Sequence, residues 1–256
     1  MIDYDSLLTE LVGKSVPRPN KITDGTLSGH AAGEPFEKAT YLFLKGKYPS
    51  NVFKQYEYLN DIYLKHPQTI SVADRNALFE SPTVLFLLSR GDKATKEWSP
   101  TNIFEEKQND TADIIYHTDN FYDMIDIKTR NIDKTAQPPN IISAFKLAKT
   151  CAHMIDNQEY DIFRLNYIEI DWKEAGENLI CQAAHYANLF KAAPSKLYIN
   201  WAAAMQIQFH VCDLDQTWTG TMEEWAHGYI RIFVESARRR CQKMMDDYVT
   251  PFLKYI

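Results

Sequence analysis

A pattern of alternating apolar and polar residues over 112–130 (ADIIYHTDNFYDMIDIKTR) is the clearest local signal in the chain. The pattern is interrupted at 119–120 by Asp-Asn, a pair that accepts the left-handed dihedrals of a two-residue turn, so it predicts a β-hairpin. With the turn at this position, Asp113 lies opposite Asp126. Because side chains alternate between the two faces of a strand, Lys128 lies on the face that carries both aspartates.

Helical spacing and capping residues predict helices elsewhere, and runs of β-branched and aromatic residues predict further strands. The expected helices are 3–12, 35–44, 53–65, one from about 141, and 221–248. The expected strands are 162–171, 178–184 and the first part of 197–211, and 82–88 is an apolar run of ambiguous type. This order of elements predicts a single mixed α/β domain over residues 1–256.

Three of the helix starts depend on individual residues. Pro35 fits the first turn of its helix, where its missing N–H needs no partner. Phe53 and Tyr56 are expected on the apolar face of the third helix, because they keep helical spacing with the residues that follow. Ile141 and Ile142 are expected on the apolar face of the fourth helix for the same reason.

The hairpin face with two carboxylates and an amine has two interpretations. Directly opposed Cβ atoms lie about 5 Å apart, and two like charges there repel by roughly 3 kcal/mol at an effective dielectric constant near 20. A divalent cation between Asp113 and Asp126 reverses the sign of this interaction, and oxygen ligands suit magnesium. Lys128 beside a metal holds a water or steadies a developing phosphoryl charge. The alternative is a half-buried edge strand that shows polar side chains to solvent. Glu37 has a similar pair of interpretations, as a surface carboxylate or a neighbour of the metal.

Composition limits the class of protein without identifying it. The chain has 256 residues and is 45% hydrophobic, as is usual for a globular protein. Its net charge of −6 argues against nucleic-acid binding over the whole surface but allows a cleft with locally concentrated lysines and arginines. No apolar run is long enough to span a bilayer, and the N-terminus lacks the features of a signal peptide, so no membrane partner is expected. Four scattered cysteines are typical of free thiols in a reducing cytoplasm, where we expect the protein to lie.

Basic and amide side chains near the hairpin offer candidate contacts to nucleic acid. Arg130 adds charge close to the expected metal, and Gln137 to Asn140 form a stiff proline-containing turn that presents two amides. Lys93 belongs to a small basic cluster on an expected loop, which either binds phosphates or is simply solvated. The same alternatives apply to the arginine run 238–240 on the last expected helix.

Longer sequence motifs resemble a known family. The arrangement of Asp113 with Asp126-Ile127-Lys128 resembles the core of PD-(D/E)xK nucleases, and the surrounding motifs resemble the HincII-like type II restriction endonucleases. These motifs are GTLSGHAAGEPFEK (25–38), FEEKQNDTAD (104–113), KTRNI (128–132), PNIISA (139–144) and LYINWAAAMQIQFHV (197–211), so the resemblance covers essentially the whole chain. Two departures are local: Ala112 stands where the general nuclease motif has proline, and Pro138 stands where a smaller alanine is expected.

The resemblance implies a restriction-endonuclease-like fold, a mixed central β-sheet flanked by helices, with the catalytic hairpin at 112–130 and DNA recognition at 137–142 and 197–211. It implies a homodimer that cuts double-stranded DNA at the centre of the palindrome GTYRAC to leave blunt ends, with Mg²⁺ as cofactor. The site residues it implies are Asp113 and Asp126 as metal ligands, Lys128 as the catalytic lysine, Gln137, Asn140, Tyr198 and Asn200 as base contacts, and Lys93 at the DNA backbone. Two amides upstream of the hairpin, Gln108 and Asn109, face DNA or belong to a polar loop.

Two other classes of protein fit the same core. A nuclease of DNA repair or recombination has these residues without a fixed recognition sequence. A DNA-binding protein that has lost catalysis is the other alternative, against which the intact Asp113, Asp126 and Lys128 argue.

Overall fold

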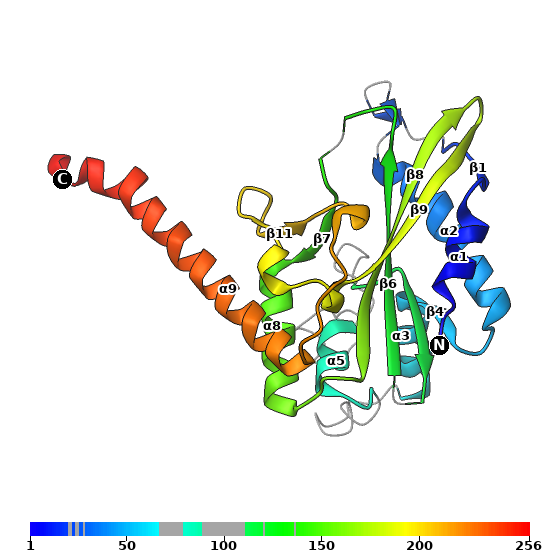
Figure 1. Ribbon diagram of the computed structural model, residues 1–256, viewed down its shortest axis with the longest axis horizontal. Helices are drawn as coiled ribbons and strands as arrows, with labels where there is room; N and C mark the ends of the chain where they lie inside the picture. Colours follow the sequence, from blue (N-terminus) through cyan, green and yellow to red (C-terminus); the bar gives the residue numbers. More distant parts are fainter. Residues whose placement is uncertain are drawn as a thin grey trace.

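A mixed six-stranded sheet forms the centre of the molecule (Figure 1). Its strands, in spatial order, are β1 (Ser15–Pro17), β9 (Asn178–Asn188), β8 (Phe163–Ala175), β6 (Phe121–Asn131), β5 (Ile114–Thr118) and β4 (Val52–Lys54). Strands β6 and β8 pair in parallel, and the other neighbours pair antiparallel. The structure is a computed structural model that describes residues 1–19, 22–23, 26–27, 29–66, 79–88, 111–119, 121–135 and 137–256.

The predicted hairpin is present with the predicted register. Strands β5 and β6 place Thr118 opposite Phe121 and Ile115 opposite Met124. Asp113 directly precedes β5, and its backbone N–H donates to the carbonyl of Ile125 at 3.0 Å. The hairpin therefore occupies the middle of the sheet, between β4 and β8.

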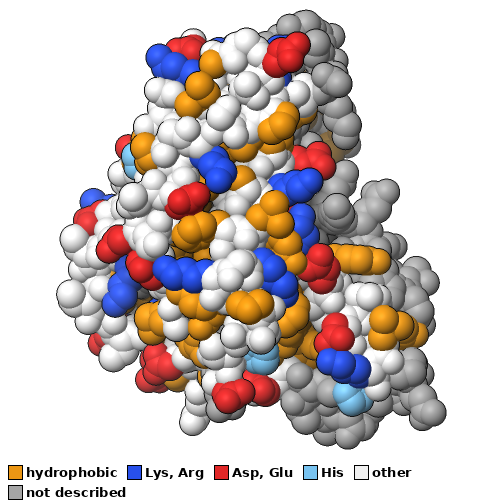
Figure 2. Space-filling view, turned by 90° about the vertical axis from the view of Figure 1, so that its right-hand side faces the viewer, with side chains coloured by type: hydrophobic (Ala, Val, Ile, Leu, Met, Phe, Trp, Pro, Cys, Tyr) orange, Lys and Arg blue, Asp and Glu red, His pale blue; other side chains and the backbone are white. Residues whose placement is uncertain are grey.

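Helices cover both faces of the sheet, so the expected sheet flanked by helices is confirmed. Helices α1 (Tyr4–Leu11) and α2 (Gly29–Lys47) pack on the face that carries Ile125 and Ile127. The opposite face carries Met124 and packs against α3 (Gln55–Lys65), α5 (Pro82–Leu88), α8 (Ala144–Asn157) and α9 (Met222–Met244). Seen from the side of α1 and α2, basic and acidic side chains are interspersed (Figure 2).

Helix α8 makes the crossover that a parallel strand pair requires. It lies between β6 and β8 in the chain, its N-terminus is capped by the side chain of Ser143, and it buries Leu147, Cys151 and Met154. The parallel register that results places Lys128 beside Glu169 and Arg130 beside Asp171 on neighbouring strands.

Two smaller sheets complete the described strands. One consists of β10 (Ile199–Asn200), β11 (Gln206–Gln208) and β7 (Asn140–Ser143), and the other of β2 (Ile22–Thr23) and β3 (Thr26–Leu27). The first of them joins the two segments that were expected to recognise DNA. Between β10 and β11, Ala204 and Met205 adopt positive φ angles of 51° and 58°, which reverse the chain within five residues.

Three expected helix starts are wrong, each because burial or strand pairing in the tertiary structure outweighs local spacing. Helix α2 begins at Gly29, so that Pro35 lies inside it, and the turns around the proline are stabilised by the fully buried Ala32 and Phe36. Phe53 belongs to β4, whose pairing with β5 satisfies its backbone, while Tyr56 at the start of α3 is 46% exposed.

The third correction concerns α8. Ile141 and Ile142 lie in β7, not on the helix, and they are buried through pairing with β11. Ser143 ends the strand and caps α8, so the helix begins three residues later than the spacing of apolar residues indicates. The ambiguous apolar run is α5, which is short and buried on all sides.

Helix α9 extends away from the body of the molecule (Figure 1). Its predicted capping box is present, with Thr221 and Glu224 bonded reciprocally to each other's backbone N–H. The first turns bury Trp225 and Tyr229, and the helix continues as a π-helical turn η5 (Met245–Val249) and a 3-10 segment η6 (Thr250–Tyr255). Met244, expected in the core or at a partner, is 48% exposed. Among the described residues, none of the helices has the length and apolar character needed to cross a bilayer.

Candidate active site and nucleic-acid interface

The three residues of the expected catalytic group lie together at the end of the hairpin away from its turn. The ammonium group of Lys128 donates to Oδ2 of Asp126 at 2.7 Å, and both side chains are mostly buried. The carboxylate of Asp113 is close enough to Asp126 for the two to share a hydrogen bond. Two carboxylates and an amine therefore share one face of the hairpin, as the alternation of side chains predicts.

Backbone hydrogen bonding explains why Asp113 points into this site. Strand β5 begins at Ile114, so the N–H of Ile127 on β6 has no strand partner, and it donates instead to Oδ2 of Asp113 at 2.7 Å. The approach to the strand is held by Gln55, whose side-chain oxygen accepts from the N–H groups of Thr111 and Ala112 at 2.9 and 3.1 Å. The carboxylate of Asp113 thus takes the place of one backbone hydrogen-bond acceptor in the pairing of β5 with β6.

The protonation of this site reflects burial and repulsion. Burial raises the pKa of Asp113 well above its ordinary value, and the charges of Asp126 and Glu37 raise it further. Burial lowers the pKa of Lys128, but the adjacent Asp126 more than offsets this, and the net pKa is above the ordinary value. Lys128 is therefore a cation at neutral pH. Glu37 pairs with Lys54 at 2.9 Å, and its charge is one of the causes that raise the pKa of Asp113.

The donor set fits a hard divalent cation. Asp113 and Asp126 offer only oxygen ligands, and their mutual repulsion is relieved when a cation lies between them. Within the described ranges, no group of three or more His, Cys, Asp or Glu residues is arranged to hold a metal. Two carboxylates suffice for magnesium, because this ion commonly keeps waters and substrate phosphate oxygens as its other ligands.

The raised pKa of Asp113 predicts a stability effect. Because the folded state binds this proton more tightly than the unfolded chain, stability is lost as the pH rises above the ordinary carboxyl pKa. Asp113→Asn cannot ionise and keeps an oxygen for the N–H of Ile127, so in EDTA at pH 8 we expect its melting temperature to rise by about 2–4 °C. The gain should vanish near pH 4, where the unfolded carboxyl is itself half protonated (about 3.9).

The test is a series of thermal melts of the wild type and of Asp113→Asn between pH 4 and pH 8 in EDTA. Asp61→Asn, which changes an exposed carboxylate on α3, is the matched control and should melt like the wild type at both pH values. A lower melting temperature for Asp113→Asn at pH 8 would show that hydrogen bonds, not repulsion, dominate at this carboxylate.

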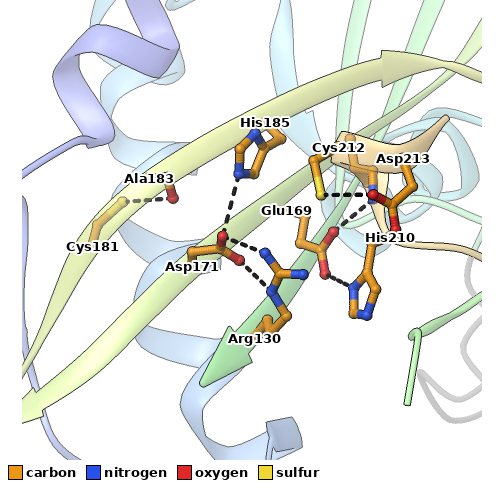
Figure 3. A network of polar contacts seen from close by, with 10 residues as sticks. Arg130, Glu169, Asp171, Cys181, Ala183, His185, His210, Cys212 and Asp213 are labelled. Carbon is orange, nitrogen blue, oxygen red and sulfur yellow. Dashed lines mark hydrogen bonds and ion pairs between the residues drawn. The ribbon is translucent and has the colours of Figure 1, made fainter. Parts of the chain in front are cut away.

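Arg130 lies one step further along the same face of β6. Its guanidinium makes two hydrogen bonds to Asp171, at 2.8 and 2.6 Å, and Asp171 also meets Nε2 of His185 at 3.3 Å (Figure 3). Arg130 was expected at DNA, and the structure pairs it with a carboxylate on the neighbouring strand. A phosphate contact from Arg130 would use only the donors that Asp171 leaves free.

A buried glutamate ties the 197–211 segment to the sheet (Figure 3). Glu169 is fully buried, and its carboxylate accepts from the backbone N–H of Val211 at 2.6 Å and contacts Nδ1 of His210 at 2.8 Å. Because Glu169 is beside Lys128 in the register of β6 and β8, this contact places the end of the 197–211 segment next to the strand that carries Asp126 and Lys128. Glu169 was not among the expected site residues. The sequence signal for Glu169 was an acid placed between two isoleucines, Ile168 and Ile170, within an expected strand.

Amide side chains connect the two expected recognition segments. Gln208 accepts from Asn200 at 2.7 Å and donates to Asn140 at 2.7 Å, across the sheet formed by β10, β11 and β7. Gln137 is exposed, and Tyr198 is 65% exposed. Gln208 was not among the expected site residues, although the alternation in Gln206-Ile207-Gln208 places it on one face of a strand. Lys93, Gln108 and Asn109 lie outside the described residues.

A central mixed sheet with clustered carboxylates and a lysine on its middle hairpin is the architecture of a restriction endonuclease. The family model described as "Restriction endonuclease HincII" matches residues 7–256, and the chain belongs to this family. The type II restriction enzyme HindII of Haemophilus influenzae strain Rd is 59% identical over 253 residues, which are 99% of this chain and 97% of that one. The type II restriction enzyme HincII of Haemophilus influenzae is 58% identical over the same shares.

Proposed function

We propose that this protein is a type II restriction endonuclease that hydrolyses double-stranded DNA at the palindrome GTYRAC and leaves blunt ends. The observation that carries the proposal is the cluster of Asp113, Asp126 and Lys128 in a chain that matches restriction endonuclease HincII over nearly its whole length. Identity of 58–59% to HindII and HincII supports a shared site preference.

The chemistry follows from the charges of the site. Asp113 and Asp126 would hold Mg²⁺, which when bound supplies positive charge to a water and to the scissile phosphate. Lys128 is positioned by Asp126 at 2.7 Å and keeps its proton, so it acts as a cation that stabilises the extra negative charge of the pentacoordinate phosphorus. Asp113 is itself held by Ile127, so both carboxylates are oriented before DNA arrives.

Digestion of one mapped plasmid in magnesium, followed by sequencing of the ends, tests this function. We expect discrete fragments with blunt ends inside GTYRAC sites, and no cleavage in EDTA. A smear of fragments would indicate a nuclease without fixed recognition, as expected of a repair enzyme, and would overturn the proposed specificity.

Gln137 is expected to influence the central base step. It is an exposed amide about ten residues beyond Lys128, and pyrimidine–purine steps unstack easily, so selection there can rest on deformability as well as on hydrogen bonds. We expect Gln137→Ala to relax discrimination at the centre of GTYRAC in a panel of duplexes that vary one base pair at a time. Gln182→Ala, an exposed amide on β9, is the control. An unchanged ranking at the central step would remove Gln137 from this role.

A palindrome cut on both strands requires two active sites related by a two-fold axis, so the proposal includes a homodimer. The distal part of α9 and its continuation offer an apolar surface for the second copy: Met244, Tyr248 and Phe252 recur every four residues and are 48%, 67% and 58% exposed. Burial of such side chains against a partner is favourable by roughly 1.5–3 kcal/mol each.

A dimer through this surface predicts the behaviour of the Tyr248→Ser, Phe252→Ser double variant. It should elute as a monomer in size-exclusion chromatography with light scattering and should lose double-strand cleavage. Asp246→Ser, which changes an exposed polar side chain in the same segment, is the control and should remain a dimer. A double variant that stays dimeric places the interface elsewhere.

A cytoplasmic location completes the proposal. All four cysteines are free thiols, two of them buried and two exposed, which is typical of a reducing compartment.

A further inference from the structure

An open groove of about 630 Å³ runs between the recognition segment and helix α9. One wall is formed by residues 195–202, which include Tyr198 and Asn200, and the other by one face of the helix. The indole N–H of Trp201 donates to Oγ of Ser236 at 2.9 Å across the groove, which fixes the distance between the walls. The helix therefore has a set position relative to the residues expected to read bases.

All charged residues that line this groove are basic. They are Lys196, Arg239, Arg240 and Lys243. Within the described part of the chain, neither Arg239 nor Arg240 makes an ion pair, and Lys243 meets Asp247 only at 4.0 Å with both side chains largely exposed. In a protein of net charge −6, this is a local concentration of positive charge in which, among the described residues, Lys243 alone meets a carboxylate.

The chemistry of the groove fits the sugar-phosphate backbone of DNA. A side chain that reads a base edge lies within a groove whose rims are phosphates, and arginine and lysine on flanking elements commonly hold those phosphates. We propose that Arg239, Arg240 and Lys243 bind backbone phosphates beside the base pairs that Tyr198 and Asn200 contact. This inference rests on the proposed function, because it needs a duplex seated on the recognition segment.

A second copy of the chain fits the groove less well. Its walls include apolar side chains such as Leu197 and Ile232, but all of its charged residues are basic, whereas the exposed large apolar side chains of this helix and its continuation, apart from Val234, occur further along, from Met244 onwards. The helix thus has two successive surfaces, a basic one beside the recognition segment and an apolar one at its far end.

The salt dependence of DNA binding tests the inference. Affinity of the full-length protein for a GTYRAC duplex is measured in calcium across a salt series, for the wild type, Arg239→Ala and Arg240→Ala. Each phosphate contact contributes about 0.9 to the slope of log K against log salt, so each variant should lower the magnitude of the slope by about 1. Cognate and non-cognate duplexes should be affected equally, because phosphates carry no sequence.

Arg238→Ala is the matched control. Arg238 is an exposed arginine next to the other two, but it does not line the groove, since it lies two residues, about 200° around the helix, from Ser236, which faces the groove. Its slope should equal that of the wild type, and all variants should melt at the wild-type temperature.

Three results would overturn the inference. The first is a slope for Arg239→Ala and Arg240→Ala that equals the wild-type slope. The second is a slope for Arg238→Ala that falls as much as theirs, because such a fall reports only the net charge of the helix. The third is a change in oligomeric state with the slope intact, which assigns the groove to a second copy. A wild-type protein that binds no duplex would instead reject the proposed function, and this inference with it.

Discussion

Lys128→Ala is expected to lower the rate of DNA cleavage by at least about a hundredfold, the range seen when one donor to a developing negative charge is lost. The lysine remains protonated because Asp126 raises its pKa, and the 2.7 Å ion pair keeps it beside the carboxylates that would hold the metal. Sequence-specific binding measured in calcium should survive, since the lysine acts mainly on charge that develops during the reaction.

Single-turnover cleavage of a GTYRAC duplex, with binding measured in parallel, makes the test. Lys65→Ala, an exposed lysine of α3 paired with Asp61, should cleave at the wild-type rate. If Lys128→Ala cleaves within a few-fold of the wild type, Lys128 has no part in the mechanism. If binding is lost together with cleavage, its role is in holding DNA instead.

Glu169→Ala is expected to damage both stability and site discrimination. Removing this carboxylate leaves the buried N–H of Val211 without its partner, which costs about 1–3 kcal/mol, and it detaches His210 from the sheet. The recognition segment then loses its anchor beside Lys128. Glu169 is in this sense a positioning residue.

The measurements are the melting temperature and the ratio of cleavage rates at cognate and single-mismatch duplexes. We expect both to fall for Glu169→Ala and to recover in part for Glu169→Gln, whose amide oxygen still accepts from Val211. Glu174→Ala, an exposed glutamate of the same strand paired with Arg18, is the control and should change neither. A Glu169→Ala protein that is less stable but keeps the wild-type ratio would limit Glu169 to a structural role.

The sequence by itself determined the features that depend on contacts between near neighbours in the chain. The hairpin register follows from the turn at 119–120 and from alternation, and it places Asp113, Asp126 and Lys128 on one face. The caps of α1 and α9 are equally local, since Asp3 and Thr221 bond to N–H groups three residues ahead. Such features need no knowledge of the rest of the fold.

The tertiary structure alone decided the features that depend on distant partners. Ile141 and Ile142 form a strand because β11, more than sixty residues later, pairs with them and outweighs their helical spacing. Glu169 is acceptable in the core only because Val211 and His210 arrive to satisfy it.

The same reason applies to the surfaces that would meet DNA. Asn140 and Asn200 lie far apart in the sequence, and only the sheet formed by β10, β11 and β7 joins them through Gln208. Arg239 is one of three adjacent arginines, and only the packing of Trp201 on α9 separates the arginines that face the recognition segment from the one that does not. Contacts between residues distant in the sequence depend on how whole elements pack, and local sequence patterns carry no record of that packing.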